Sequence, residues 1–96
     1  MSNSRTEIGF QWDPAKAVSN ERKHGVPFEF AVRVFDDPRA MEADTTRTED
    51  RETRTKAVGS VDGLLYCIVF TRRDEFIRVI SARRANSSER KLYDSV

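Results

Sequence analysis

The segment Leu64–Phe70 restricts the fold of this chain more than any other stretch. Its seven residues, Leu-Leu-Tyr-Cys-Ile-Val-Phe, are apolar at both alternating sets of positions. Because successive side chains of a strand point to opposite faces, a strand of this kind must be covered on both faces. We therefore predict that it lies in the middle of a β-sheet.

Two further strands are predicted beside it. Thr53–Gly59 precedes the central strand, which we expect to run from Leu64 to Thr71, and Phe76–Arg83 follows it. The turns between them are Val61–Gly63, where Asp-Gly is typical of a tight hairpin, and Arg72–Glu75. Strands joined by such short turns are expected to form an antiparallel meander.

The N-terminal part is predicted to add a strand and a helix. Ile8–Trp12 alternates between apolar and polar residues, as in a short strand with one buried side. Asp13 and Pro14 then favour the start of a helix, and Gly25 favours its end after His24. Residues 1–7 are polar and are predicted to be disordered.

A second, more deeply buried helix is predicted to start near Pro27. Its apolar residues Phe28, Ala31, Val32 and Phe35 fall at the helical spacing i, i+3, i+4 and i+7. The sequence Asp-Asp-Pro at positions 36–38 ends it.

Shorter elements complete the chain. Arg39–Glu42 is predicted as a short strand, and Ala43–Glu52, which has almost no apolar residue, as an exposed loop or hairpin tip. Asn86 and Glu89 have the spacing of a capping box, which starts a C-terminal helix with Leu92 and Val96 four residues apart.

These elements predict an α+β protein built on an antiparallel sheet. The expected order is a short N-terminal strand, two helices, a meander of three to four strands and a C-terminal helix. The 96 residues suffice for a single domain with a thin core.

Charge is distributed unevenly, although the formal net charge is only +1. Residues 29–52 carry eight acidic and four basic side chains, whereas residues 72–91 carry seven basic and three acidic ones. A basic face of this kind can bind phosphate even in a near-neutral protein. The other interpretation is that the two segments neutralise each other on the surface.

Several kinds of chemistry are disfavoured by composition. The single cysteine, Cys67, rules out an internal disulfide and lies in the apolar strand, where a small buried residue is expected rather than a nucleophile. With His24 the only histidine and placed at a helix end, no set of side chains has metal-ligand spacing. We find no glycine-rich phosphate loop, membrane-spanning run or signal peptide, and expect a cytoplasmic protein without a cofactor.

Arg83 and Arg84 follow the last predicted strand, so the core would hold them in place. Strand alternation groups Arg83 with Ile77, Val79 and Ser81, and Arg84 with Phe76, Arg78, Ile80 and Ala82. Two fixed guanidinium groups suit the stabilisation of a phosphate transition state. The simpler interpretation of Arg83 and Arg84 is a salt bridge to Glu52, Asp50 or a helix carboxylate.

The preceding strand offers further polar groups. Arg54 and Lys56 share one of its faces, and Glu52 beside them is a possible general base. Tyr66 could stack on a base or transfer a proton, although a tyrosine on a central strand is more often part of the core.

Six short motifs follow one another in a specific order along the chain. They are Phe-Gln-Trp-Asp-Pro-Ala-Lys-Ala (10–17), Lys-His-Gly-Val (23–26), Phe-Asp-Asp-Pro (35–38), Ala-Val-Gly (57–59), Ile-Ser-Ala-Arg-Arg-Ala (80–85) and Glu-Arg-x-x-Tyr (89–93). Each motif is weak alone, and their order over residues 10–93 makes the set specific. In this set the chain resembles the BrnT toxins, which are small bacterial ribonucleases with a RelE-like fold.

The resemblance implies a toxin of a type II toxin–antitoxin system that cleaves RNA without a metal and inhibits translation and growth. It implies neutralisation by a BrnA-type antitoxin, in an assembly of two toxins and two antitoxins in which only the antitoxin binds operator DNA. The Ile-Ser-Ala-Arg-Arg-Ala match assigns the family's site to Arg83 and Arg84. This chain has Thr53 and Thr55 where relatives often have an aromatic residue, which weakens any base-stacking role there.

Our hypothesis from these residues is a ribonuclease that uses the 2′-hydroxyl of RNA as its nucleophile. Arg83 would stabilise the charge that develops on the scissile phosphate, and Arg84 and Arg54 would position neighbouring phosphates. Glu52 or Tyr66 would be the base. The remaining candidates for RNA binding are Lys56, Arg78 and Tyr66. The alternative is a non-catalytic binding module, or a degenerate toxin that acts as a co-repressor with a DNA-binding antitoxin.

Overall fold

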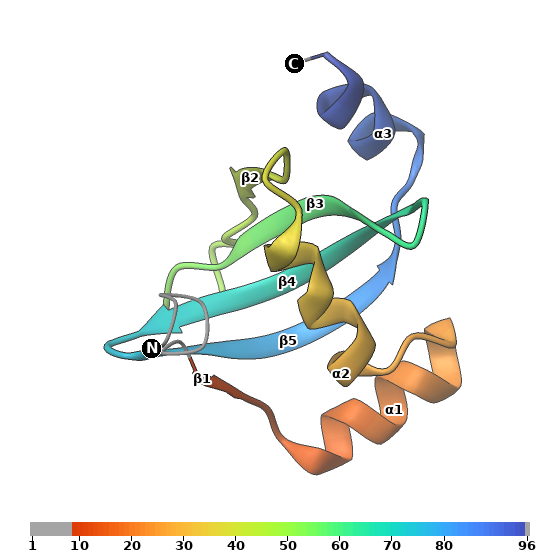
Figure 1. Ribbon diagram of the computed structural model, residues 1–96. Helices are drawn as coiled ribbons and strands as arrows, with labels where there is room; N and C mark the ends of the chain where they lie inside the picture. Colours follow the sequence, from red (N-terminus) through yellow and green to blue (C-terminus); the bar gives the residue numbers. More distant parts are fainter. Residues whose placement is uncertain (1–8, 96) are drawn as a thin grey trace, which may run out of the picture.

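The computed structural model describes residues 9–95, which contain a five-stranded sheet (Figure 1). Its strands are β1 (Gly9–Gln11), β2 (Met41–Asp44), β3 (Thr55–Val61), β4 (Leu64–Arg73) and β5 (Phe76–Arg84). Their order across the sheet is β1-β5-β4-β3-β2, so the central strand is β4, as its apolar composition predicted. The predicted disorder of residues 1–7, and the predicted roles of Ile8 and Val96, lie outside the described residues.

The sheet is antiparallel except at one edge. β2, β3, β4 and β5 pair antiparallel in chain order, which confirms the predicted meander with four strands. β1 runs parallel to β5 and pairs Gly9 with Phe76 and Gln11 with Arg78. A parallel pair needs a long connection, and the intervening elements supply it. The predicted α+β fold is confirmed, with a mixed sheet rather than a purely antiparallel one.

The two tight turns of the meander, between β3 and β4 and between β4 and β5, contain residues with positive φ. Asp62 and Gly63 between β3 and β4 have φ of 52° and 85°, the geometry that matches the twist of a tight hairpin and confirms the predicted Asp-Gly turn. The second hairpin turns at Asp74, with φ of 38°, and Glu75. β4 therefore extends two residues beyond the predicted Thr71.

Helix α1 (Pro14–His24) begins and ends at the predicted residues. The Asp13 side chain accepts a hydrogen bond from the Ala15 N–H at 2.9 Å, and Gly25 closes the helix with φ of 72°. α1 lies beside the edge of β5 (Figure 1). There the Asn20 side chain accepts from the Ala82 N–H at 3.1 Å and donates to the Ala82 carbonyl at 2.8 Å. Asn20 thus takes the place of a neighbouring strand where β1 has ended.

The second helix occupies the predicted segment but changes its winding. α2 spans Phe28–Ala31, and the 3₁₀ helix η2 continues through Val32–Asp36. Such tightening is common at the ends of short helices. Its buried residues Phe28, Ala31 and Val34 face the sheet, which confirms that this is the better-buried of the first two helices.

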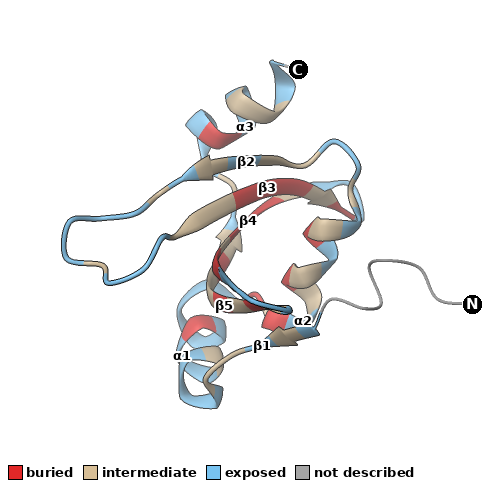
Figure 2. Ribbon diagram, turned by 90° about the vertical axis from the view of Figure 1, so that its left-hand side faces the viewer, coloured by how far each residue is buried: buried red, intermediate tan, exposed pale blue. Residues whose placement is uncertain are grey.

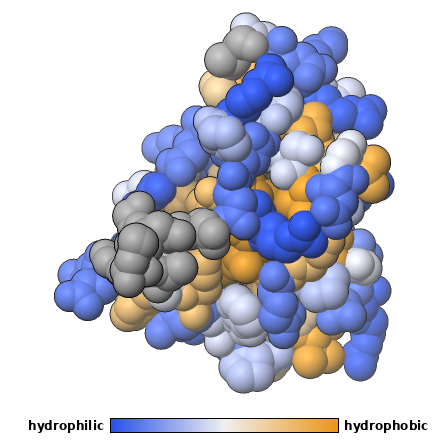
Figure 3. All heavy atoms as spheres, viewed as in Figure 1, coloured by the Kyte–Doolittle hydropathy of each residue, from blue (hydrophilic) through white to orange (hydrophobic). Residues whose placement is uncertain are grey.

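The core lies between α2, η2 and one face of the sheet, which we call the helix face. Figure 2 shows buried positions gathered where α2 faces β3, β4 and β5. Phe35 packs edge-on against Phe70, with ring centroids 5.1 Å apart. Gly59 lies so close to η2 that a Cβ there would approach Val34 Cγ1 to 2.8 Å. On the outer side of this layer hydrophilic side chains predominate, with small apolar patches between them (Figure 3).

The connection between β2 and β3 begins later than predicted. β2 is shifted two residues beyond the predicted strand Arg39–Glu42, so the loop covers residues 45–54. The Arg47 guanidinium and N–H donate to Asp50 within this loop, at distances of 2.8–3.3 Å. The Thr45 N–H bonds the Arg54 carbonyl at 2.9 Å and closes the base of the loop.

The C-terminal helix α3 (Ser87–Asp94) has the predicted capping box. The Asn86 side chain accepts from the Glu89 N–H, and the Glu89 carboxylate accepts from the Asn86 N–H, both at 2.9 Å. At the other end of α3, Tyr93 donates its hydroxyl proton to Asp37 at 2.7 Å. The two ends of α3 are therefore tied to different parts of the protein.

The predicted grouping of side chains along β5 is wrong because the strand contains a bulge. Val69 pairs with Ser81 but Phe70 pairs with Val79, so Ile80 is an extra residue and the alternation shifts there. Ile77, Val79, Ala82 and Arg84 consequently share the helix face with Ile68 and Phe70. Phe76, Arg78, Ser81 and Arg83 lie on the opposite face, which we call the distal face.

Candidate active site

Arg83 and Glu89 form the best-organised charged pair of the distal face. The Nη1 and Nη2 atoms of Arg83 donate to the two carboxylate oxygens of Glu89, each at 2.8 Å. The Glu89 side chain is only 1% exposed, whereas that of Arg83 is 33% exposed. The helix carboxylate considered in the sequence analysis is therefore the partner of Arg83.

Lys56 joins the same carboxylate from strand β3. Its Nζ lies 3.0 Å from Glu89 Oε2, and Glu89 Oε1 also accepts from the Asn86 N–H. Both oxygens of Glu89 thus have two donors each. The bidentate bond from Arg83 is the main cause that lowers the pKa of Glu89 to about 2, against the opposing effect of burial. Glu89 is an anion in the folded protein at neutral pH.

The charge cluster, which we define as Lys56, Arg83 and Glu89, keeps a net positive charge. Two cations share one carboxylate, and the side chains of Lys56 and Arg83 are 26% and 33% exposed. Lys56 has three donors and Arg83 has five, so donors remain after Glu89 is satisfied. The cluster can therefore bind an anion from solvent while its own carboxylate stays buried.

Cys67 lies beneath the cluster and is fully buried opposite Arg83 on β4. Burial first, and then the Glu89 carboxylate, raise the pKa of the thiol to about 11. A thiol held in this form is a poor nucleophile. Cys67 is thus the small buried residue that its sequence context predicted.

The remaining predicted site residues are not all brought to the cluster. Arg84 lies on the helix face, where its guanidinium stacks over the Tyr66 ring at 5.5 Å. Tyr66 is 8% exposed and packs edge-on against Phe30 at 5.2 Å, so it belongs to the core. The side chains of both residues therefore lie on the opposite face of the sheet from the Arg83 side chain, which contacts Arg84 through its carbonyl, at 3.2 Å.

Glu52 lies near the opposite end of the distal face. It forms a bidentate pair with Arg73 at 3.1 Å, beside the turn between β4 and β5. Arg73 is six positions from Cys67 along β4, which corresponds to roughly 20 Å at about 3.3 Å per residue. Glu52 is therefore not a neighbour of the charge cluster.

Two predicted cations take intermediate positions. Arg54 lies just before β3, with its Nε 3.5 Å from Asp50. Arg78 shares the distal face with Arg83 and donates to the Gln11 side chain at 2.9 Å. Arg78 therefore extends the positive charge of this face along β5.

The family model described as the ribonuclease toxin BrnT of type II toxin–antitoxin systems matches residues 12–89. The chain belongs to the BrnT family. No protein among those with curated descriptions matches it. As a BrnT-family ribonuclease toxin it acts on RNA and has an antitoxin as its partner.

In this BrnT-family toxin a second cluster of polar residues serves the structure. Asp37 accepts from the Ser60 N–H at 2.8 Å and from Tyr93. Burial acts to raise the pKa of Asp37, but the bonds from Ser60, Tyr93 and Arg39 outweigh it and lower the pKa. Asp37 therefore joins the end of η2 to β3 and α3.

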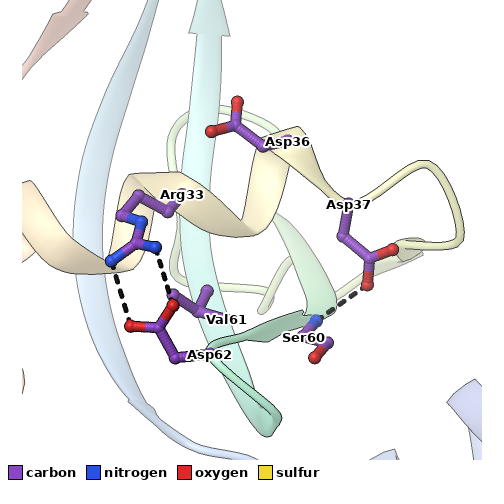
Figure 4. Close-up of a pocket in the computed structure, with 6 residues that line it drawn as sticks. All are labelled: Arg33, Asp36, Asp37, Ser60, Val61 and Asp62. Carbon is purple, nitrogen blue, oxygen red and sulfur yellow. Dashed lines mark hydrogen bonds and ion pairs between the residues drawn. The ribbon is translucent and has the colours of Figure 1, made fainter.

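A shallow cavity of about 240 Å³ adjoins Asp37, and three of its six lining residues are acidic (Figure 4). Arg33 closes one side through a bidentate bond to Asp62, at 2.8 and 3.2 Å. The hydrogen bonds of Asp37 and Asp62 hold neighbouring segments together, so we assign no ligand to this cavity. Within residues 9–95 no three His, Cys, Asp or Glu side chains are grouped so as to hold a metal ion.

Sequence reasoning missed Glu89, Asp37 and Asn20 as residues that organise the site. Glu89 was identified only as half of a capping box, although its position in the Glu-Arg-x-x-Tyr motif was a usable signal. Asp37 likewise lies in the Phe-Asp-Asp-Pro motif. Asn20 carries no local signal beyond being polar on a helix.

Among residues 9–95, no helix is long and apolar enough to cross a membrane.

Proposed function

We propose that this toxin cleaves RNA at the charge cluster of the distal face, and thereby inhibits translation and growth. The observation that supports this site is the convergence of Arg83 and Lys56 on one buried carboxylate, with a net positive charge left for the substrate. The family match supports the reaction class, and the free positive charge of the cluster supports its choice as the site.

The proposed reaction requires little from the protein beyond positive charge held in a fixed position. When the 2′-oxygen attacks the adjacent phosphorus, the bond from phosphorus to the 5′-oxygen of the next nucleotide breaks, leaving a 2′,3′-cyclic phosphate and a 5′-hydroxyl. Water takes the 2′-hydroxyl proton and supplies the proton of the leaving 5′-oxygen. Between these states, negative charge accumulates on the non-bridging oxygens. Guanidinium and ammonium groups that are already in position stabilise that charge without reorganising. Arg83 is the main stabilising group in this scheme, and Lys56 contacts the same phosphate or its neighbour.

Glu89 acts as a positioning residue in this scheme. Its pKa of about 2 and its four hydrogen bonds make it a poor proton acceptor. Without it, Lys56 and Arg83 would repel each other and lose their common anchor. We propose that Glu89 sets the separation of the two cations and fixes the plane of the Arg83 guanidinium.

The other residues predicted for the site are assigned different roles. Arg78 lies on the distal face with the cluster, and Arg54 precedes the strand that carries Lys56. We retain both as RNA-binding residues. Arg84 and Tyr66, on the helix face, and Glu52, beside Arg73, are not retained as catalytic residues. Removal of the 2′-hydroxyl proton is assigned to no residue.

A BrnA-type antitoxin is proposed as the neutralising partner, in an assembly of two toxins and two antitoxins. The support is the family's type II system, in which a protein antitoxin restrains the toxin. Binding of operator DNA is assigned to the antitoxin alone.

A non-catalytic role is the second candidate, and one observation favours it. Arg83 and Lys56 are each paired with Glu89, as in an ordinary structural salt bridge. A chain that binds its antitoxin and represses its operon, yet leaves RNA intact at high concentration, would support that role.

Expression of Arg83→Ala in cells tests the proposed function. We expect growth arrest and RNA degradation to disappear. The fold should be weakened by the loss of the main partner of Glu89 but retained, because Lys56 still pairs with that carboxylate, and capture of the antitoxin checks this. Arg33→Ala is the matched control, since Arg33 also forms a bidentate pair, with Asp62, but on the surface away from the cluster. Growth arrest by a folded Arg83→Ala protein would show that the role of Arg83 is wrong.

A further inference from the structure

A hollow of about 280 Å³ lies between α1 and β5, at the end of β5 that carries Arg83. Its polar lining comes from Lys16, Ser19, Lys23 and His24 of α1 and from Ser81 of β5. Lys16 and Lys23 are seven residues apart and therefore lie on one side of the helix. Asn20, between them, holds that side against the backbone of Ala82.

The basic side chains of this hollow have no partners among residues 9–95. Lys16, Lys23 and His24 form no ion pair and no side-chain hydrogen bond with any residue of 9–95. Most other basic side chains near the sheet are paired: Lys56 and Arg83 with Glu89, Arg72 with Glu42, and Arg73 with Glu52. The hollow therefore concentrates charge that the protein leaves available.

Lys16 lies in the first turn of α1, where the amino end of the helix carries partial positive charge. The Asp13 carboxylate, which caps this end, compensates that charge. Lys23 and His24, in contrast, lie in the last turn, where they suit the helix dipole.

Ser81 links the hollow to the charge cluster. It lies on the distal face two residues before Arg83, which corresponds to about 6.6 Å along a strand. That separation is comparable to the spacing of successive phosphates in an extended nucleic-acid strand. A positively charged groove that follows the backbone is a common way to hold single strands.

We propose that this hollow binds a phosphate of the RNA strand that flanks the scissile phosphate. Lys16 and Lys23 supply the charge, and the hydroxyls of Ser19 and Ser81 supply hydrogen bonds. The proposal rests on the proposed function for the position of the scissile phosphate, but it concerns binding rather than chemistry. The proposal defines the path of the RNA strand over the protein surface, which runs from β3 across β5 to α1.

The test is the salt dependence of binding by the full chain to a 2′-O-methyl oligoribonucleotide, which lacks the nucleophile and is not cleaved. For single strands the slope of log K against log salt decreases by about 0.7 for each phosphate that the protein no longer neutralises. We expect Lys16→Gln/Lys23→Gln to lower the slope by about that amount and to weaken binding. Arg22→Gln/Arg90→Gln is the matched control, since both arginines are exposed and lie outside the hollow.

Two further measurements separate this proposal from the proposed function. With cleavable RNA, the lysine variant should raise KM and leave the rate at saturating RNA unchanged, because its contact is remote from the reacting atoms. If the unchanged protein binds the oligonucleotide with the expected slopes but cleaves no RNA, the proposed function fails and the subsite stands.

Equal slopes for the lysine variant and the control variant would overturn the subsite. So would a lysine variant that weakens capture of the antitoxin while its RNA slope is unchanged, because the hollow would then be a protein-binding surface. Circular dichroism of each variant checks that α1 has remained folded.

Discussion

The two faces of the sheet use adjacent arginines in different ways. On the helix face, Arg84 covers the ring of Tyr66 and closes the end of the apolar layer. On the distal face, Arg83 is held by Glu89 and shares it with Lys56. The side chains are chemically identical, so the difference comes from what each face offers. Arg84 stacks on an aromatic ring and shields it from solvent. Arg83 binds a buried carboxylate, which fixes the orientation of its guanidinium.

The largest effect is expected from Glu89→Ala, which would leave two cations of the distal face without their common anion. Removing one partner of a buried ion pair typically destabilises by about 3–5 kcal/mol. Urea unfolding measures this destabilisation. Glu29→Ala is the matched control, since Glu29 is exposed on α2. A stability for Glu89→Ala close to that of the control would show that the cluster does not stabilise α3.

Arg83→Ala tests the difference between the two faces most directly, through the rate of RNA cleavage. Removal of one donor to developing charge costs about a hundredfold to a thousandfold in rate, and we expect a decrease of that size in RNA cleavage by purified protein. The measurement is the single-turnover rate on a defined RNA at one salt concentration. A decrease of the same size for Arg84→Ala would contradict the division between the two faces.

Low pH should lower the free energy of unfolding by protonating Glu89 on the distal face. Its pKa in the folded protein is about 2, below the ordinary value of 4.5, so ionised Glu89 stabilises the fold above the higher value. That contribution should disappear progressively as the pH falls from 4.5 to about 2. The free energy of unfolding, measured across this range, should fall less steeply for Glu89→Gln than for the unchanged protein.

Asn20→Ala should loosen the strand on which both arginines depend. It would leave the N–H and carbonyl of Ala82 without their partners in a buried position. An unsatisfied buried polar group costs about 1–3 kcal/mol. Hydrogen exchange at Ala82 and the unfolding midpoint should both report the change. Slow exchange at Ala82 in the variant would show that another group covers the edge of β5.

The smallest effect is expected on the helix face from Arg84→Ala. A cation–π contact at an exposed site contributes about 0.5–1 kcal/mol, so stability should decrease by that amount and cleavage should persist. Thermal unfolding together with a cleavage assay checks both halves. Arg84→Lys should recover part of the stability, because a cation over Tyr66 is restored.

Most of the fold followed from local patterns. The apolar run of β4, the Asp62-Gly63 turn and the caps of α1 and α3 each depend on neighbouring residues, and each is present as predicted. The parallel pairing of β1 with β5 and the bulge at Ile80 depend on contacts between distant segments. A single extra residue in the pairing of β5 was enough to reverse the faces of Ile77 and Val79.

The candidate site was predicted in part. Arg83 and Lys56 were chosen as single residues, but their common partner Glu89 could not be placed without knowing where α3 lies on the sheet. Glu52 was favoured because it is near Arg54 in sequence, yet the loop turns it toward Arg73. Side chains in long loops follow the path of the backbone, which the sequence pattern did not define.

The pairing of β1 with β5 also has a consequence for the order of folding. It joins residues 9 and 76, so this edge of the sheet can form only after most of the described chain has been synthesised. Contacts between distant residues form slowly, because closing a long loop costs entropy. During synthesis Lys56 emerges well before Arg83 and Glu89, and the charge cluster is completed only when α3 docks. We therefore expect the nascent toxin to be harmless to RNA until its last elements have been made, which leaves time for an antitoxin to find it.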